Sequence, residues 1–88
     1  MPLVSVIIPA YNEEKDIEEC IKSLAKQSFK DFDIILVDDG STDKTISAAS
    51  KFRKIKILKQ NHGGPGAARN LGAKNARGRI LVFIDADM

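Results

Sequence analysis

The sequence predicts an α/β protein in which helices cover both faces of a mostly parallel sheet. Four short runs rich in β-branched residues alternate with three stretches whose apolar residues recur at helical spacing. Such alternation favours parallel strands joined by right-handed helical crossovers. The expected order of elements along the chain is therefore βαβαβαβ.

The first strand and helix are read from the N-terminal part of the chain. Residues 3–8 are dominated by β-branched side chains and are expected to form a buried strand. Residues 13–26 place their apolar side chains on one helical stripe. Asn12 is the expected N-cap of this helix, with Glu13 and Glu14 at the positive end of the helix dipole.

The second strand and helix repeat this pattern. Residues 32–37 have the strand signature, and the following Asp-Asp-Gly-Ser-Thr-Asp stretch stops it. A helix is expected over residues 43–52, with Ser41 or Asp43 as its cap.

The C-terminal part supplies two more strands and one more helix. Residues 55–58 and 80–84 are expected strands, and a helix is expected to start at Pro65 and to run to about residue 76. Gly78 is expected to end it in a left-handed conformation. We expect a Rossmann-like, four-stranded sheet in the spatial order 3-2-1-4.

Composition limits the classes of protein to consider. With 88 residues the chain is one small domain, and a hydrophobic content of 43% with 30% charged residues is that of a soluble globular protein. A net charge of +2 provides no strong basic field for nucleic acid. The single cysteine, Cys20, rules out an internal disulfide framework and is expected in the core. Without a membrane-length apolar run or a signal peptide, a cytoplasmic protein is expected.

Polar residues and glycines follow each of the four expected strands. The stretches are PAYNEE, DDGSTD, QNHGGPGAARN and DAD. In open α/β sheets, ligands bind beyond the carboxyl ends of the strands, near the point where the strand order reverses. These four stretches are therefore where a binding site is expected.

Asp85 and Asp87 come directly after an apolar strand. If the strand conformation continues, their spacing of two places both carboxylates on one side. Two neighbouring carboxylates repel each other unless a cation lies between them, and Mg²⁺ or Mn²⁺ commonly joins carboxylates to substrate phosphates. The alternative is that both side chains simply face water.

The other strand ends allow similar pairs of interpretations. Asp38 and Asp39 are able to accept hydrogen bonds from a ribose or a base, or they merely form the turn. In HGGPGAARN, glycine N–H groups, a helix start and Arg69 suit a phosphate, although a flexible loop is the alternative. The stretch lacks the Gly-Lys-Ser/Thr ending of a Walker loop and does not follow the first strand as a dinucleotide fingerprint does. His62 is expected to be a loop residue and not a ligand.

Taken together, VSVIIPAYNEE, IILVDDGSTD, GGPGAARNLG and ILVFIDADM resemble the nucleotide-sugar-binding half of family 2 glycosyltransferases, which have the GT-A fold. The resemblance implies half of a GT-A fold over residues 1–88. It also implies an enzyme that transfers a sugar from a nucleotide diphosphate donor, usually a UDP-sugar, with inversion at the anomeric carbon.

The resemblance also implies roles for individual residues around the nucleoside. Pro9, Tyr11 and Glu13 would lie around the base and the ribose. Asp38 or Asp39 would contact the uridine.

Further residues are implied for the diphosphate. Arg69 would lie on the base or diphosphate side. Within the Asp-x-Asp motif, Asp85 would face the ribose or the metal shell, and Asp87 would hold the divalent cation, Mn²⁺ or Mg²⁺.

Family members continue beyond this motif into an acceptor-binding half that supplies the general base, so no catalytic residue is expected within these 88 residues. The last strand, left at the sheet edge, is expected to pair with another copy in a homo-oligomer. The complete enzyme is expected at the cytoplasmic face of the membrane.

Two alternatives stay open. The chain is a fragment that folds and self-associates without significant nucleotide binding, or it is a phospho-acceptor signalling domain of flavodoxin type. The four motifs in register argue against the second.

Overall fold

The computed structural model describes residues 2–87 and confirms the expected α/β architecture. Four strands form one sheet in the order β3-β2-β1-β4, and each neighbouring pair is parallel. The strands are β1 (Val4–Ala10), β2 (Phe32–Asp38), β3 (Ile55–Lys59) and β4 (Ile80–Phe83). The helices are α1 (Ile17–Ala25), α2 (Thr45–Ala49) and α3 (Pro65–Asn75).

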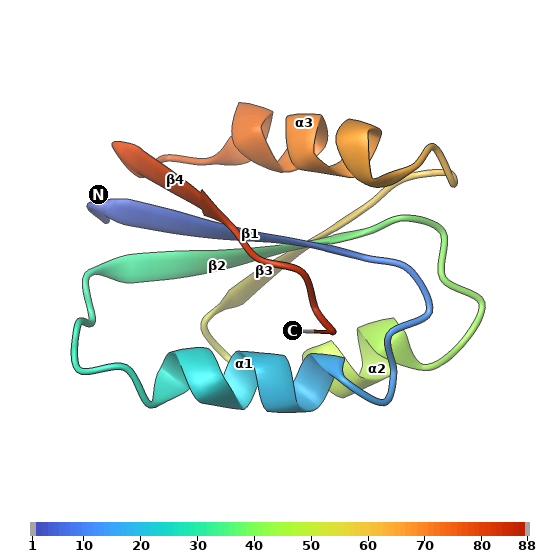
Figure 1. Ribbon diagram of the computed structural model, residues 1–88, viewed down its shortest axis with the longest axis horizontal. Coiled ribbons are helices and arrows are strands. Elements are labelled where there is room, and N and C mark those ends of the chain that lie inside the picture. The colour runs from blue at the N-terminus through green and yellow to red at the C-terminus, as the bar shows by residue number, and fades with distance from the viewer. Residues whose placement is uncertain (1, 88) are drawn as a thin grey trace.

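The sheet lies between two helical layers. Helix α3 covers one face, whereas α1 and α2 cover the other (Figure 1). Successive strand residues point to opposite faces, so the buried apolar runs of β1 and β2 supply both layers. Ile8 and Leu36 belong to the core beneath α1 and α2, and Ile7 and Ile35 to the core beneath α3. Cys20 is buried in the first of these cores, as expected, and burial raises the pKa of its thiol.

Helix α3 lies so close to the sheet that one position on it excludes a side chain. A Cβ atom at Gly72 would come within 2.5 Å of Ile7 Cγ2 and 3.2 Å of Val37 Cγ2. Glycine at this position therefore lets the helix pack directly on the two central strands, β1 and β2.

The start of α1 differs from the prediction. The helix begins at Ile17, its N-cap is Asp16, and Asn12 lies four residues before the cap in the left-handed region, with φ 53°. The side-chain oxygen of Asn12 instead accepts a hydrogen bond from Thr42 N, at 2.8 Å. The expected N-cap was wrong because Asn12 bonds to a segment distant in sequence.

Helix α2 is shorter than expected, with five residues in place of the predicted 43–52. Neither expected cap was right, because the N-cap is Lys44, which makes no side-chain capping hydrogen bond. Asp43 lies one residue before it, and its Oδ1 accepts a hydrogen bond from Thr45 N at 2.9 Å. Burial raises the pKa of the Asp43 carboxyl, but hydrogen bonds from Thr45 and Glu14 outweigh this and lower it.

The role expected for Gly78 was wrong. Helix α3 ends at Asn75, and among residues 2–87 the glycines with positive φ are Gly40 and Gly64. Gly78 lies against β1, where its N–H donates to Ser5 Oγ at 2.8 Å and a Cβ atom would collide with the Ser5 backbone. A close approach of two backbones, and not a left-handed turn, requires glycine here.

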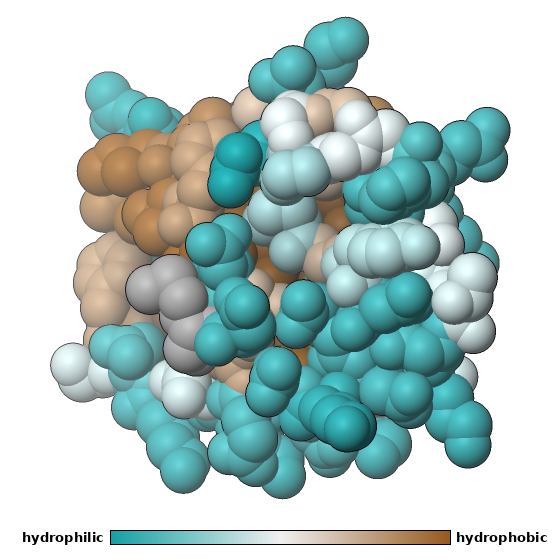
Figure 2. Space-filling view, turned by 45° about the vertical axis from the view of Figure 1, so that its right-hand side comes forward, coloured by the Kyte–Doolittle hydropathy of each residue, from teal (hydrophilic) through white to brown (hydrophobic). Residues whose placement is uncertain are grey.

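Strand β4 ends at Phe83, one residue earlier than expected, and forms an exposed edge of the sheet. All four of its residues, Ile80, Leu81, Val82 and Phe83, are between 38% and 51% exposed. Figure 2 shows hydrophobic surface gathered on one side of a mostly hydrophilic face, on the side where β4 runs in Figure 1.

Candidate functional site

A hollow of about 470 Å³ lies beyond the carboxyl ends of the strands. The loops that leave β1, β2 and β3 emerge on the same side of the molecule (Figure 1). The hollow is lined by Pro9, Ala10, Tyr11, Glu13, Asp39, His62, Pro65, Ala68, Arg69, Asp85, Ala86 and Asp87. The strand ends expected to form a site therefore do meet in space.

Strand β1 and its following loop contribute Pro9, Tyr11 and Glu13, all assigned from the sequence. The Tyr11 side chain is exposed, so its ring is available at the mouth of the hollow. The Glu13 N–H donates to Thr45 Oγ1 at 2.9 Å, which holds the loop against the start of α2.

The Glu13 carboxyl group lies near several other carboxylates, and its pKa is raised. Burial raises the pKa of its carboxyl, and the carboxylates of Asp87, Asp16, Asp43 and Asp85 raise it further. A cation placed among these groups would relieve the repulsion.

The two aspartates at the end of β2 have different environments. Asp38 does not line the hollow; its Oδ2 accepts a hydrogen bond from Ser41 N at 3.1 Å, as a turn residue does. Its Oδ1 is buried, with no hydrogen-bond partner among the described residues. Asp39 is the member of the pair that lines the hollow.

Asp39 fastens the loop between β3 and α3 to the end of β2. Its Oδ1 accepts hydrogen bonds from Gln60 Nε2 at 2.7 Å and Gly63 N at 2.8 Å, and its Oδ2 accepts one from Gly64 N at 3.0 Å. Burial raises the pKa of this carboxyl, but these hydrogen bonds and His62 outweigh burial and lower it. Asp39 is therefore a buried anion stabilised by the loop between β3 and α3.

His62, expected from the sequence to be a loop residue and not a ligand, also lines the hollow. Its Nδ1 lies 3.0 Å from Asp39 Oδ2 and 3.1 Å from the Asp39 carbonyl oxygen. Its ring lies against that of Tyr11, with the centroids 4.3 Å apart. A signal was present in the aromatic residue and the acidic pair that follow strands 1 and 2, because topology brings such residues to one rim.

Helix α3 and the segment after β4 form the charged side of the hollow. Helix α3 begins at Pro65, as predicted, and carries Arg69, whose Nη2 lies 3.8 Å from Asp85 Oδ1. The strand does not continue through the DAD motif, because a turn forms at residues 86–87. Asp85 and Asp87 nevertheless both line the hollow, and burial of Ala86 in the core places them there.

Two aspartates, Asp85 and Asp87, are the candidate metal ligands on the charged side of the hollow. Within residues 2–87, no three His, Cys, Asp or Glu side chains are grouped closely enough to hold a metal ion by themselves. Asp85 and Asp87 offer exposed carboxylate oxygens of the kind that hard divalent cations prefer.

No helix among residues 2–87 has both the length and the apolarity needed to cross a membrane.

Comparison with known families matches the profile of glycosyl transferase family 2 to residues 5–88. The chain belongs to this family. Curated relatives of the family 2 chain include an uncharacterized glycosyltransferase, EpsJ, of Bacillus subtilis, which is 46% identical over 91 residues. They also include the poly(ribitol-phosphate) β-N-acetylglucosaminyltransferase TarS of Staphylococcus aureus, 46% identical over 90 residues.

The family 2 chain spans only part of these relatives. The alignment with EpsJ covers 99% of this chain and 26% of EpsJ, and that with TarS covers 94% and 16%. Solved GT-A structures agree in fold. TarS residues 1–349 in complex with UDP superimposes with a TM-score of 0.92 at 44% identity, covering 99% of this chain and 28% of that one. The mannosyltransferase PcManGT of Pyrobaculum calidifontis, in complex with GDP-Man and Mn²⁺, gives a TM-score of 0.92 at 32% identity, covering 98% and 28%.

Proposed function

We propose that this chain is the donor-binding part of an inverting glycosyltransferase and that its hollow binds a nucleotide diphosphate sugar, with UDP as the nucleotide. One observation carries the proposal: of the eight residues assigned from the sequence, all but Asp38 line one hollow at the carboxyl ends of the strands. Its volume of about 470 Å³ suits a small-molecule ligand. The solved complexes of TarS with UDP and UDP-GlcNAc support the choice of nucleotide.

The proposed nucleoside end of the hollow is the side formed by Tyr11, His62 and Asp39. The paired rings of Tyr11 and His62 offer an aromatic surface for a base. Asp39 holds His62 and the glycine N–H groups of the loop between β3 and α3 in place on this side of the hollow, and it is the aspartate proposed to lie beside the nucleoside. Of the two aspartates that follow β2, we therefore propose Asp39 as the one near the nucleotide. Asp38 is proposed only to stabilise the turn.

The proposed diphosphate end is the side formed by Arg69, Asp85 and Asp87. The donor set fits Mn²⁺ or Mg²⁺, since such ions are commonly held by one or two carboxylates together with substrate phosphates. Asp85 and Asp87 would hold such an ion, and its positive charge would be available to a departing nucleoside diphosphate. Arg69 is positioned to pair with the same phosphates, because its guanidinium already lies near Asp85.

We assign no general base within these 88 residues. The carboxylates that line the hollow are Glu13, Asp39, Asp85 and Asp87, and the proposal uses them to hold the donor and its cation. We expect the base and the acceptor site in the parts of the longer relatives that this chain does not match.

Titration calorimetry with UDP tests the proposal. We expect saturable heat of binding when Mn²⁺ is present and much weaker binding when the metal is removed with a chelator. Mn²⁺ titrated without nucleotide is the control, and it should bind weakly, because the proposed ligands among residues 2–87 are the two carboxylates of Asp85 and Asp87. Absence of heat from UDP with Mn²⁺ would favour the alternative of a folded fragment without nucleotide binding.

We also propose that the chain forms a homodimer through β4. Among residues 2–87, its exposed apolar residues lie at the edge of the sheet, and such an edge tends to pair with another strand. Light scattering should show a dimer, and Val82→Lys should convert it to a monomer by placing a charge on the edge. A monomer at high concentration of the unmodified chain would contradict this proposal.

A further inference from the structure

We propose that a second hollow binds an amphiphile in which an apolar chain is joined to a single anionic group. The hollow measures about 540 Å³, within the range of small-molecule sites. It lies near the amino ends of β2 and β3, whereas the donor hollow lies beyond the carboxyl ends, so the two are at opposite ends of the sheet.

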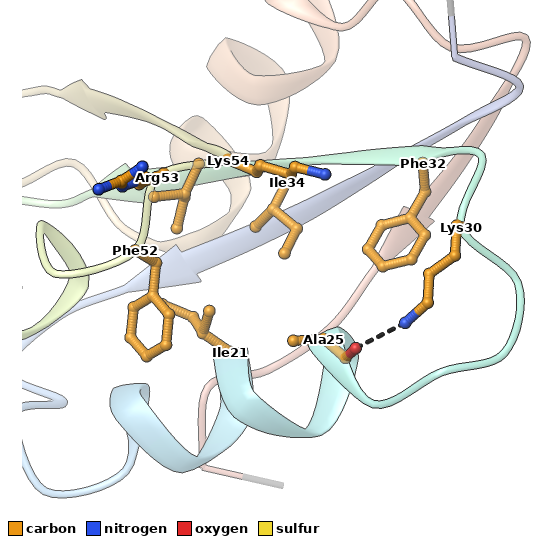
Figure 3. A pocket seen from close by; sticks show the side chains of 9 residues that line it. Ile21, Ala25, Lys30, Phe32, Ile34, Phe52, Arg53 and Lys54 are labelled. Carbon is orange, nitrogen blue, oxygen red and sulfur yellow. Dashed lines mark hydrogen bonds between the residues drawn. The ribbon is translucent and has the colours of Figure 1, made fainter.

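The interior of the second hollow is apolar. Phe32 and Ile34 of β2 face Ile21 of α1 across the space, and Phe52 lies at its side (Figure 3). Ala25, at the end of α1, leaves the opening wide because its side chain is a single methyl group. An alkyl chain or an apolar ring would bury carbon surface here, and this is the contribution expected to drive binding.

The polar side chains that line the second hollow are all cationic. Lys30, Arg53 and Lys54 line the hollow, and none of its nine lining residues is acidic. Lys30 Nζ donates a hydrogen bond to the Ala25 carbonyl oxygen at 2.7 Å, which holds its ammonium group beside the helix end (Figure 3). Charge complementarity therefore selects an anion attached to the apolar group.

This combination separates the occupant from a nucleotide. The second hollow contains no glycine loop and no carboxylate for a metal, which are the groups the donor hollow offers. A carboxylate joined to an alkyl chain matches both its apolar interior and its cationic lining. The inference is independent of the proposed donor site.

Decanoate is the probe that tests this proposal on the intact 88-residue chain. Backbone amide spectra recorded during titration should show saturable shifts at Phe32, Ile34 and Phe52 and none at Asp39. Decanol, which lacks the charge, should bind at least tenfold more weakly, and decyltrimethylammonium should bind more weakly still. Shifts confined to β4, equal affinity for decanol, or shifts without saturation would overturn the proposal.

Two variants separate charge from shape. The double variant Lys30→Glu and Lys54→Glu should weaken decanoate binding at least tenfold. The control is the double variant Lys74→Glu and Arg77→Glu, which changes the net charge by the same amount at residues that do not line the hollow. Decanoate binding should be unchanged in this control. Ala25→Phe should block binding by filling the opening while circular dichroism shows an unchanged fold. Unchanged affinity in either hollow variant would overturn the proposal.

Discussion

Replacing Asp87 with asparagine is expected to reduce Mn²⁺-dependent UDP binding by at least about 100-fold, because even outer-shell partners of metal ligands typically contribute 10- to 100-fold to metal affinity. The amide keeps the shape of the side chain but removes the negative charge proposed to hold the cation. Calorimetry with and without Mn²⁺ measures the effect, and the residual metal-independent binding should match that of the unmodified chain.

The fold should tolerate this change. Asp87 is exposed, and its charge contributes to raising the pKa of Glu13, so removing it relieves repulsion. Asp16→Asn is the matched control, since Asp16 also raises the pKa of Glu13 but does not line the hollow. If both variants weakened UDP binding equally, the effect would be one of general charge and the metal role of Asp87 would be wrong.

Replacing Asp39 with asparagine is expected to destabilise the protein by about 2–4 kcal/mol, since an unsatisfied buried donor costs about 1–3 kcal/mol and charge-assisted hydrogen bonds are lost as well. The asparagine oxygen would still accept from Gln60 and Gly63. Its NH₂ group, however, would face the N–H of Gly64, which then has no acceptor. Urea unfolding at neutral pH measures the loss, and UDP binding should fall with it.

The pH dependence of this difference tests its electrostatic origin. Asp39 has a lowered pKa in the folded state, so its contribution is present in full above the unfolded value of 3.8 and is lost as the pH falls through the folded value. The difference in unfolding free energy between Asp39→Asn and the unmodified chain should therefore shrink below about pH 3.8. Asp31→Asn, at an exposed position, is the matched control for the loss of one negative charge. A difference that stays constant with pH would show that shape, and not charge, is what Asp39 supplies.

The sheet was predictable because its two central strands, β1 and β2, are nearly continuous apolar runs in the sequence. β1 and β2 are buried on both faces, so their composition alone distinguishes them from helices, and the topology rules then leave few arrangements. The position of the hollow followed from the same rules, since parallel strands bring their carboxyl ends to one rim.

The details that could not be predicted depend on contacts between segments distant in sequence. Asn12 has the composition of an N-cap, yet it bonds to Thr42, thirty residues away. His62 has an ordinary loop sequence around it; the strand topology predicts that it shares a rim with Tyr11 and Asp39, but not that it contacts them. Gly78 reads as a helix end, but what excludes a side chain there is the backbone at Ser5. Local patterns contain no information about such partners.

The two sides of the hollow at the carboxyl ends of the strands are held in place by different kinds of contact. On the side of β1, three successive backbone N–H groups, those of Asn12, Glu13 and Glu14, donate to side chains of residues 41–45, so two turns form one interlocked body. The acidic wall is attached through Ile84 N to the Ile7 carbonyl oxygen, at 3.0 Å, and through the buried methyl group of Ala86. We therefore expect the first wall to keep its shape when a ligand binds and the acidic wall to adjust more easily. Any adjustment to ligands of different size is then expected at residues 84–87, on the acidic wall.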